Sequence, residues 1–177
     1  MKELNYPFDA EYIIKKKKSL KRQLLADTNR NFVEKRIAIL GGETTENIKL
    51  TLELFLLNYG IKPYFYESEY NQYYEDGMFP NPELEEFKPD IIYICTCVRN
   101  IVDFPALSDQ KEVVEQKKQA VVDKFYGLWD SVAERYHCPI IQNNFEYPFF
   151  RLMGNKDASD YHGRVNFVTM LNCAFYE

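Results

Sequence analysis

The chain has 177 residues, a length that fits one domain with a single hydrophobic core. Its formal net charge is -5, and its basic residues are scattered apart from a run at residues 15–18, so the basic surface that nucleic-acid-binding proteins need is missing. There is no signal peptide and no run of about 18 apolar residues, so we expect a cytoplasmic protein without a membrane partner. The four cysteines lack zinc-ligand spacing, and we expect free thiols and no metal site.

The first predicted element is a helix. Residues 1–8 should be extended, and Asp9 is a suitable N-cap for a helix that ends near Leu25. Its apolar stripe would consist of Ile13, Ile14, Leu20 and Leu24. The lysines at 15–18 point around most of the helix, so a solvated surface is the simpler interpretation, with a partner-binding role as the alternative.

A glycine turn follows the first predicted strand. Residues 36–41 are a short, mainly apolar run that leads into Gly41 and Gly42, which is typical of a buried parallel strand that turns into a helix. That helix is apolar on two sides, and Gly60 is placed to end it. Ligands of α/β proteins gather at such turns. The turn matches neither the dinucleotide-binding nor the P-loop glycine motif, so it is weak evidence for a phosphate site.

Two further strands and a short helix follow. Residues 62–67 alternate as a second strand and lead into a polar, tyrosine-rich turn at 68–74. Pro82 suits the first position of a short helix that ends near Lys88. Residues 90–97 are almost continuously apolar, which predicts a central third strand.

A long helix precedes the last strand. Asp109 and Glu112 have the spacing of a capping box at its start, and residues 137–139 should end it. Residues 140–143 read as a short fourth strand. Val165, Val168, Leu171 and Phe175 predict a final helix.

This alternation of strands and helices predicts an α/β fold with a central parallel sheet and helices on both faces, because parallel strands need right-handed crossovers. We expect one domain over residues 1–177. Residues 1–34 would form an N-terminal helix and connector, and residues 35–177 a sheet-and-helix core.

Polar residues are dense in the segments that would leave the carboxyl ends of the strands. They are Glu43 and Thr44, then Glu67, Ser68 and Asn71, then Arg99 and Asn100, then Gln142, Asn143, Asn144 and Glu146, with Asp157, Asp160, His162 and Arg164 just beyond. Because parallel strands share one carboxyl edge, these residues could line one ligand cleft. Polar loops also simply solvate sheet ends, so both interpretations stay open.

Three catalytic pairs can be considered among them. Glu43 and Glu146 could form a carboxylate pair, although solvated glutamates are commoner. His162 and Asp160 could be a base and its orienting partner, although a turn is the simpler explanation. Cys97 and His162 could form a nucleophilic pair, although Cys97 lies in a predicted buried strand.

Three segments carry a family resemblance, namely residues 40–45, 90–94 and 142–148. The last, with the sequence Gln-Asn-Asn-Phe-Glu-Tyr-Pro, is the most specific. Together they resemble the N-terminal region of FkbH-like proteins, which belong to subfamily IIIC of the haloacid dehalogenase (HAD) superfamily. That region is similar to SGNH (GDSL-like) hydrolases, and the resemblance implies a flavodoxin-like, three-layer α/β/α fold over essentially the whole chain.

The resemblance also implies that the hydrolase site has been lost. SGNH enzymes carry a serine nucleophile in a Gly-Asp-Ser turn, and Glu43 occupies that position here, with Gly42 in place of the aspartate. Their Gly-x-Asn-Asp block matches residues 97–100, so Arg99 replaces the oxyanion-hole asparagine. Residues 160–162 are one residue too short to match the Asp-x-x-His block.

In FkbH-like proteins a HAD-like domain follows this region. The subfamily is associated with loading a phosphorylated glyceryl unit onto the phosphopantetheine arm of an acyl carrier protein. That chemistry needs an Asp-x-Asp-x-Thr/Val motif and magnesium, and the motif is absent here. We therefore expect no cofactor in this chain, with magnesium only in a downstream phosphatase domain.

These observations lead to three functional hypotheses. The first is a non-catalytic or weakly active domain that binds an acyl carrier protein, a downstream HAD-like domain, or an acyl or glyceryl ligand at the carboxyl edge of the sheet. Its expected ligand-binding residues are Gly41, Gly42, Glu43, Thr44, Arg99, Asn100, Asn143 and Asn144. The second is a divergent esterase or acyl hydrolase with candidate catalytic residues Glu43, Thr44 and His162. The third is a structural or oligomerisation domain.

Overall fold

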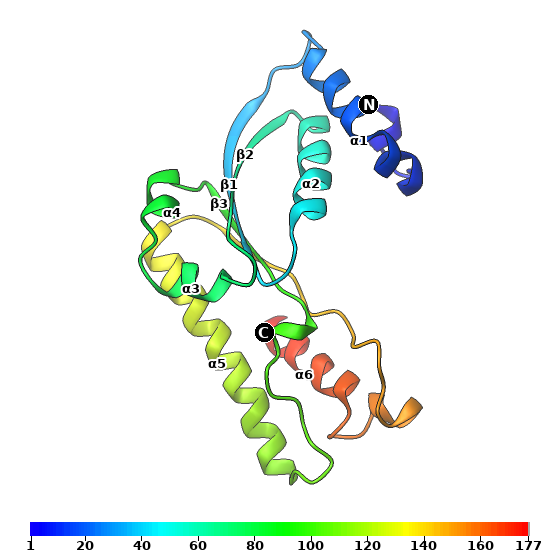
Figure 1. Cartoon of the computed structure of the whole chain (residues 1–177), viewed down its shortest axis with the longest axis vertical. Helices are drawn as coiled ribbons and strands as arrows, with labels where there is room; N and C mark the ends of the chain where they lie inside the picture. Colours follow the sequence, from blue (N-terminus) through cyan, green and yellow to red (C-terminus); the bar gives the residue numbers. More distant parts are fainter. Residues whose placement is uncertain (177) are drawn as a thin grey trace.

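A four-stranded parallel sheet lies at the centre of the protein, whose computed structural model describes residues 1–176 (Figure 1). Its strands are β1 (Val33–Gly41), β2 (Ile61–Glu67), β3 (Ile91–Cys95) and β4 (Ile140–Gln142), in the spatial order β2-β1-β3-β4. All three pairings are parallel, so the prediction of a parallel sheet is confirmed. β1 starts earlier than the predicted residue 36 because Val33 pairs with Ile61 of β2.

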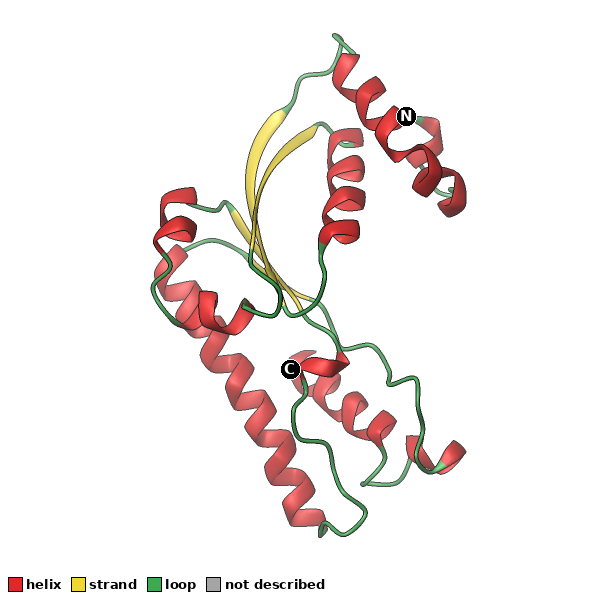
Figure 2. Cartoon of the chain, in the orientation of Figure 1, coloured by secondary structure: helices red, strands yellow, loops and turns green. Residues whose placement is uncertain are grey.

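Helices connect and cover the strands (Figure 2). The α-helices are α1 (Ala10–Ala26), α2 (Glu46–Asn58), α3 (Tyr73–Met78), α4 (Pro82–Phe87), α5 (Lys111–Tyr136) and α6 (Arg164–Tyr176). Short 3-10 helices form at Lys2–Leu4, Val98–Asn100 and Gly154–Ala158. α5 has 26 residues, so it is about 39 Å long and extends well past the sheet (Figure 1).

The two faces of the sheet are packed differently. Ile37 and Ile39 of β1 face α2, whose Ile48 and Leu56 lie against them. The opposite face is packed against α3, α4, α5 and α6 through a larger cluster that includes Ala38, Leu40, Ile92, Ile94, Leu84, Phe125, Leu128 and Phe167. Helices therefore cover both faces, and the flavodoxin-like, three-layer α/β/α fold class is confirmed.

α1 forms an additional outer layer. Its buried side chains Ile13, Leu20 and Leu24 pack with Leu54 and Leu57 of α2. Figure 1 shows α1 on the side of α2 that faces away from the sheet. α1 is thus held to the fold mainly through α2.

Several predicted helix ends are confirmed. The Asp9 side chain accepts a hydrogen bond from the Tyr12 N–H at the start of α1. Pro82 occupies the first turn of α4, and the Asn81 side chain caps that helix by accepting from the Leu84 N–H. Gly60 follows α2 with a φ of 79°, a left-handed conformation that favours glycine.

Other local predictions are wrong. Residues 2–4 form a 3-10 helix within the segment expected to be extended, and the tyrosine-rich turn contains the start of α3. Ile14 is 65% exposed, so it does not belong to the apolar stripe of α1. Asp109 does not cap α5; its carboxylate instead accepts from the Ala106 N–H and pairs with Lys117.

The cysteines are free thiols, as predicted. Cys95 and Cys97 are buried, Cys138 is partly buried and Cys173 is exposed. Within residues 1–176, no helix is both long enough and apolar enough to cross a membrane.

Candidate functional site

The turn after β1 is fitted closely against Asn100. The Gly42 N–H donates to the Cys95 carbonyl at 2.8 Å, which holds the turn beside β3. Asn100 Nδ2 donates to the Gly42 carbonyl at 3.0 Å, and a Cβ added at Gly42 would lie 2.4 Å from Asn100 Oδ1. Glycine is therefore required at 42 because a larger residue would displace the asparagine.

Asn100 also connects two other segments of this edge. Its Oδ1 accepts from the Cys97 N–H at 2.8 Å, and its Nδ2 donates to Asn71 Oδ1 at 3.0 Å. Asn71 lies on the loop after β2, in a left-handed conformation with a φ of 61°. One side chain thus joins the loops that leave β1, β2 and β3.

A pocket of about 360 Å³ lies beside this turn, at the start of α2. We call it the turn pocket. It is lined by Glu43, Thr44, Thr45, Glu46, Lys49, Glu67, Ser68 and Tyr70. Its volume is within the range of small-ligand sites. Of the predicted binding residues, Glu43 and Thr44 line it directly.

The turn pocket contains both paired and unpaired polar groups. Lys49 Nζ is 3.0 Å from Glu67 Oε1, so the ammonium is already paired. The second carboxylate oxygen of Glu67 and the hydroxyl of Ser68 are buried and have no hydrogen-bond partner. The Cys95 thiol is 4.0 Å from Glu43 Oε1, and burial, followed by the effect of nearby carboxylates, raises the pKa of this thiol. Cys95 is therefore a neutral core residue and a poor nucleophile.

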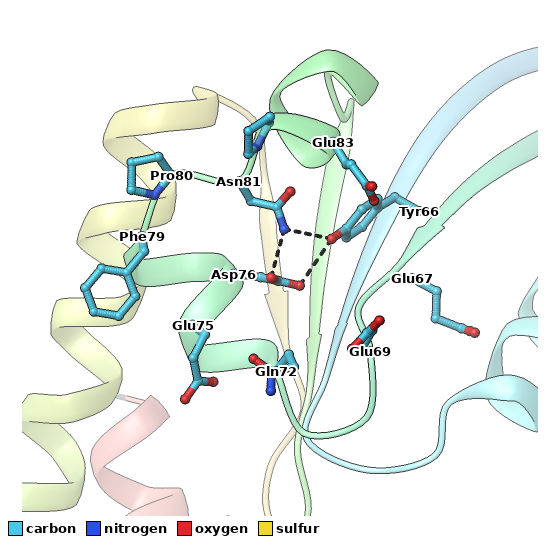
Figure 3. A pocket seen from close by; sticks show the side chains of 11 residues that line it. Tyr66, Glu67, Glu69, Gln72, Glu75, Asp76, Phe79, Pro80, Asn81 and Glu83 are labelled. Carbon is cyan, nitrogen blue, oxygen red and sulfur yellow. Dashed lines mark hydrogen bonds between the residues drawn. The ribbon is translucent and has the colours of Figure 1, made fainter.

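A second hollow, of about 620 Å³, opens on the other side of β2 (Figure 3). At its base, Tyr66 Oη donates to Asp76, and Asn81 Nδ2 donates to both Tyr66 Oη and Asp76. Figure 3 shows the Glu67 carboxylate pointing away from this network. Burial, followed by the charge of Asp76, raises the pKa of Tyr66 to about 12. The phenol therefore stays neutral and acts as a structural donor.

Asn143 and its neighbours join β3 to β4. Asn143 Oδ1 accepts from the Thr96 N–H, and its Nδ2 donates to the Thr96 carbonyl at 2.7 Å. Glu146 Oε2 accepts from the Val98 N–H at 3.0 Å, so the carboxylate proposed as a partner for Glu43 has a structural contact of its own. Arg99 and Asn144 are exposed on the surface.

His162 lies on the loop before α6 and is held by groups outside the turn pocket. Its Nδ1 is 2.9 Å from Asp160 Oδ1, and its Nε2 is 2.9 Å from the Asp109 carbonyl, just before the start of α5. Figure 1 shows the start of α5 at the end of the molecule that lies away from the sheet. Asp160 also accepts from the His162 N–H, which is the turn geometry considered in the sequence. The structure does not pair His162 with Thr44 or Cys97.

No histidine is among the residues that line the turn pocket. The other histidine, His137, caps the C-terminus of α5 just before β4, at the opposite edge of the sheet. The described residues also contain no group of three His, Cys, Asp or Glu side chains that could hold a metal ion. The turn pocket can therefore bind through hydroxyls, carboxylates and backbone amides, and it has no histidine to activate Thr44.

Two parts of this region were missed from the sequence. Lys49 lies one turn inside α2 and reaches the pocket only because β2 places Glu67 beside it. The network of Tyr66, Asp76 and Asn81 joins β2 to α3, a helix that was not predicted. Within this network, the only residue with a recognisable local sequence signal is Asn81, which precedes Pro82 at the start of α4.

Comparison with known proteins supports the fold. No protein-family model matches the sequence, and no curated protein matches it. Among solved structures, the fold is similar to the N-terminal part of the protein BF1531 from Bacteroides fragilis, which contains a phosphatase domain and is complexed with Mg. The TM-score is 0.68 at 20% sequence identity, over 90% of this chain and 41% of that chain.

The two proteins share a fold, and the present chain spans less than half of the length of BF1531 in that structure. This level of identity says nothing about which residues the two proteins use. A match to one α/β layer arrangement is also compatible with many activities.

Proposed function

We propose that this chain is a non-hydrolytic binding domain of a larger protein that also carries a phosphatase domain. Its ligand would be the acyl or glyceryl group of a carrier-linked substrate, held at the carboxyl edge of the sheet by Gly42, Glu43, Thr44 and Asn100. The likeness to the N-terminal part of a phosphatase-containing protein supports the domain context. The resemblance to FkbH-like proteins supports the carrier-linked ligand.

The observation that carries the proposal is the placement of the two histidines. An SGNH-type hydrolase needs an imidazole to take the proton from its nucleophile. By the resemblance to SGNH enzymes, Glu43 stands at the position of the nucleophile. The ring nitrogens of His162 contact the Asp160 carboxylate and the Asp109 carbonyl. Thr44 lines the pocket together with carboxylates, and none of the lining residues is a histidine. Binding without ester hydrolysis is the function that this arrangement supports best.

An NMR titration tests the binding. We expect a phosphopantetheinylated carrier protein loaded with a glyceryl group to shift the amide signals of Gly42, Thr44 and Asn100, with the signals of α1 as an internal control. An unchanged spectrum would contradict the proposal.

A hydrolysis assay tests the absence of turnover. We expect no release of p-nitrophenol from short acyl esters above the buffer rate, for the native protein and for Thr44→Ala alike. Turnover that disappears in Thr44→Ala would support the divergent esterase instead.

A further inference from the structure

A pocket of about 420 Å³ lies between the first half of β1 and the C-terminal ends of α4 and α5. We call it the cationic pocket. It is lined by Arg36, Glu85, Lys88, Pro89, Arg135 and Tyr136. Figure 1 shows α4 beside the C-terminal end of α5, where these residues meet. The pocket shares no lining residue with the turn pocket, and its volume is within the range of small-ligand sites.

The residues that line the cationic pocket carry more positive than negative charge. Arg36, Lys88 and Arg135 are cations, and Glu85 is the one carboxylate among the lining residues. The C-terminal ends of α4 and α5 each add at most about half a negative charge. The lining therefore remains positive, although the formal net charge of the whole chain is -5.

Two of these cations keep N–H donors that have no partner within residues 1–176. Lys88 is exposed at the end of α4, and its ammonium forms no ion pair with any described residue. Asp90 lies 3.7 Å from Arg36 Nε and accepts from the Arg36 N–H at 2.7 Å, so this carboxylate occupies one side of the guanidinium. The terminal nitrogens of Arg36 remain available to a ligand, together with the ammonium of Lys88.

Arg135 supplies a positive charge that is held in place without being neutralised. Its guanidinium donates to the carbonyls of Met78 and Phe79 at 3.1 and 2.6 Å, at the end of α3. These acceptors are uncharged, and Arg135 forms no ion pair in the described part of the chain. An anion that enters the pocket is therefore attracted by a side chain that is already ordered.

We propose that the cationic pocket binds a phosphate dianion, either as free phosphate or as the terminal group of a phosphate ester. Arginine and lysine bind phosphate through charge-assisted hydrogen bonds, and its oxygens can accept from several donors at once. A monocarboxylate brings one charge and two oxygens, so it satisfies fewer of the free donors of Arg36 and Lys88. A cationic ligand would be repelled by the three cations. The site is separate from the turn pocket, so this inference is independent of the proposed function.

An NMR titration of the full chain tests this preference, at constant ionic strength because added salt screens exposed charges. We expect inorganic phosphate to give saturable shifts of the Lys88 and Tyr136 amide signals. Acetate should bind at least about fivefold more weakly, which corresponds to one exposed ion pair. Adenosine monophosphate carries the same dianion on an organic group. Tighter binding of adenosine monophosphate than of phosphate would identify a phosphate ester as the ligand, and weaker binding would identify free phosphate.

Charge variants test which residues are responsible. Lys88→Gln should weaken phosphate binding about two- to fivefold, the usual contribution of an exposed ion pair, and Glu85→Gln should strengthen it. Lys18→Gln is the matched control because it removes an exposed lysine of α1 and changes the net charge equally. All three side chains are exposed, so the fold should be retained. Three results would overturn the inference: no saturable response to phosphate, acetate binding as tight as that of phosphate, or equal weakening by Lys88→Gln and Lys18→Gln.

Discussion

The contact between Gly42 and Asn100 depends on the identity of these two residues. From the sequence, Gly42 marked a turn and Asn100 was one of several polar residues at a shared edge. In the structure, the carbonyl of Gly42 accepts from the Asn100 amide, and the missing side chain makes room for it. Such a contact joins residues far apart in the chain, so no local pattern could have predicted the pair.

Gly42→Ala should therefore destabilise the protein. The new Cβ would lie 2.4 Å from Asn100 Oδ1, and forced overpacking typically costs about 1–3 kcal/mol. The free energy of unfolding, from urea denaturation, measures the effect.

Gly127→Ala is the matched control. It lies inside α5 with nothing within 4 Å of the added Cβ, so it should be neutral or stabilising by up to about 1 kcal/mol. Equal stability of the two variants would show that Asn100 moves away freely.

At the scale of helices and strands, the sequence predicted helix ends correctly where neighbouring residues determine them. The cap at Asp9, the proline at the start of α4 and the glycine after α2 depend only on neighbouring residues. α3 was missed because its sequence is polar and rich in tyrosine, and it is stabilised by packing against α5. The predicted capping box of α5 is wrong because the Asp109 carboxylate forms an ion pair with Lys117.

The packing of α1 on α2 gives a prediction for one element. Leu24 is 1% exposed and lies between the two helices, so Leu24→Ala should lower the free energy of unfolding by about 2–5 kcal/mol. Ile14→Ala is the control on the same helix, and its effect should stay within about 0.5 kcal/mol because Ile14 is largely exposed. Comparable losses in both variants would mean that α1 is placed differently.

At the scale of the whole molecule, the alternation of strands and helices was sufficient to predict the parallel sheet, because right-handed crossovers leave few arrangements. The composition of the site was only partly predictable. Glu43 and Thr44 were identified because they follow a strand directly. His162 does not line the turn pocket, and its position depends on contacts with Asp109 and Asp160 that the sequence does not reveal.

Buried tyrosines should make the stability of the protein fall at alkaline pH. Burial raises the pKa of Tyr66 and Tyr73 to about 12, against an ordinary value of 10.0, and it also raises the pKa of Tyr93. Between these values the unfolded chain loses phenolic protons that the folded protein keeps, so stability is full below pH 10 and declines towards pH 12. Urea denaturation at pH 8, 10 and 11 checks this. A flat profile would contradict it, and Tyr66→Phe should make the decline shallower.

The hydrogen bonds of Asn100 should affect the rate and the affinity with which a ligand binds. The loops that follow β1, β2 and β3 are all hydrogen-bonded to the side-chain amide of Asn100, through Gly42, Asn71 and Cys97 respectively. The rim is thereby preorganised, and the entropic cost of ordering these three loops is met during folding. Association should then be fast and accompanied by little rearrangement, and a substitution that removes these hydrogen bonds should weaken affinity because the three loops would have to be ordered when the ligand binds.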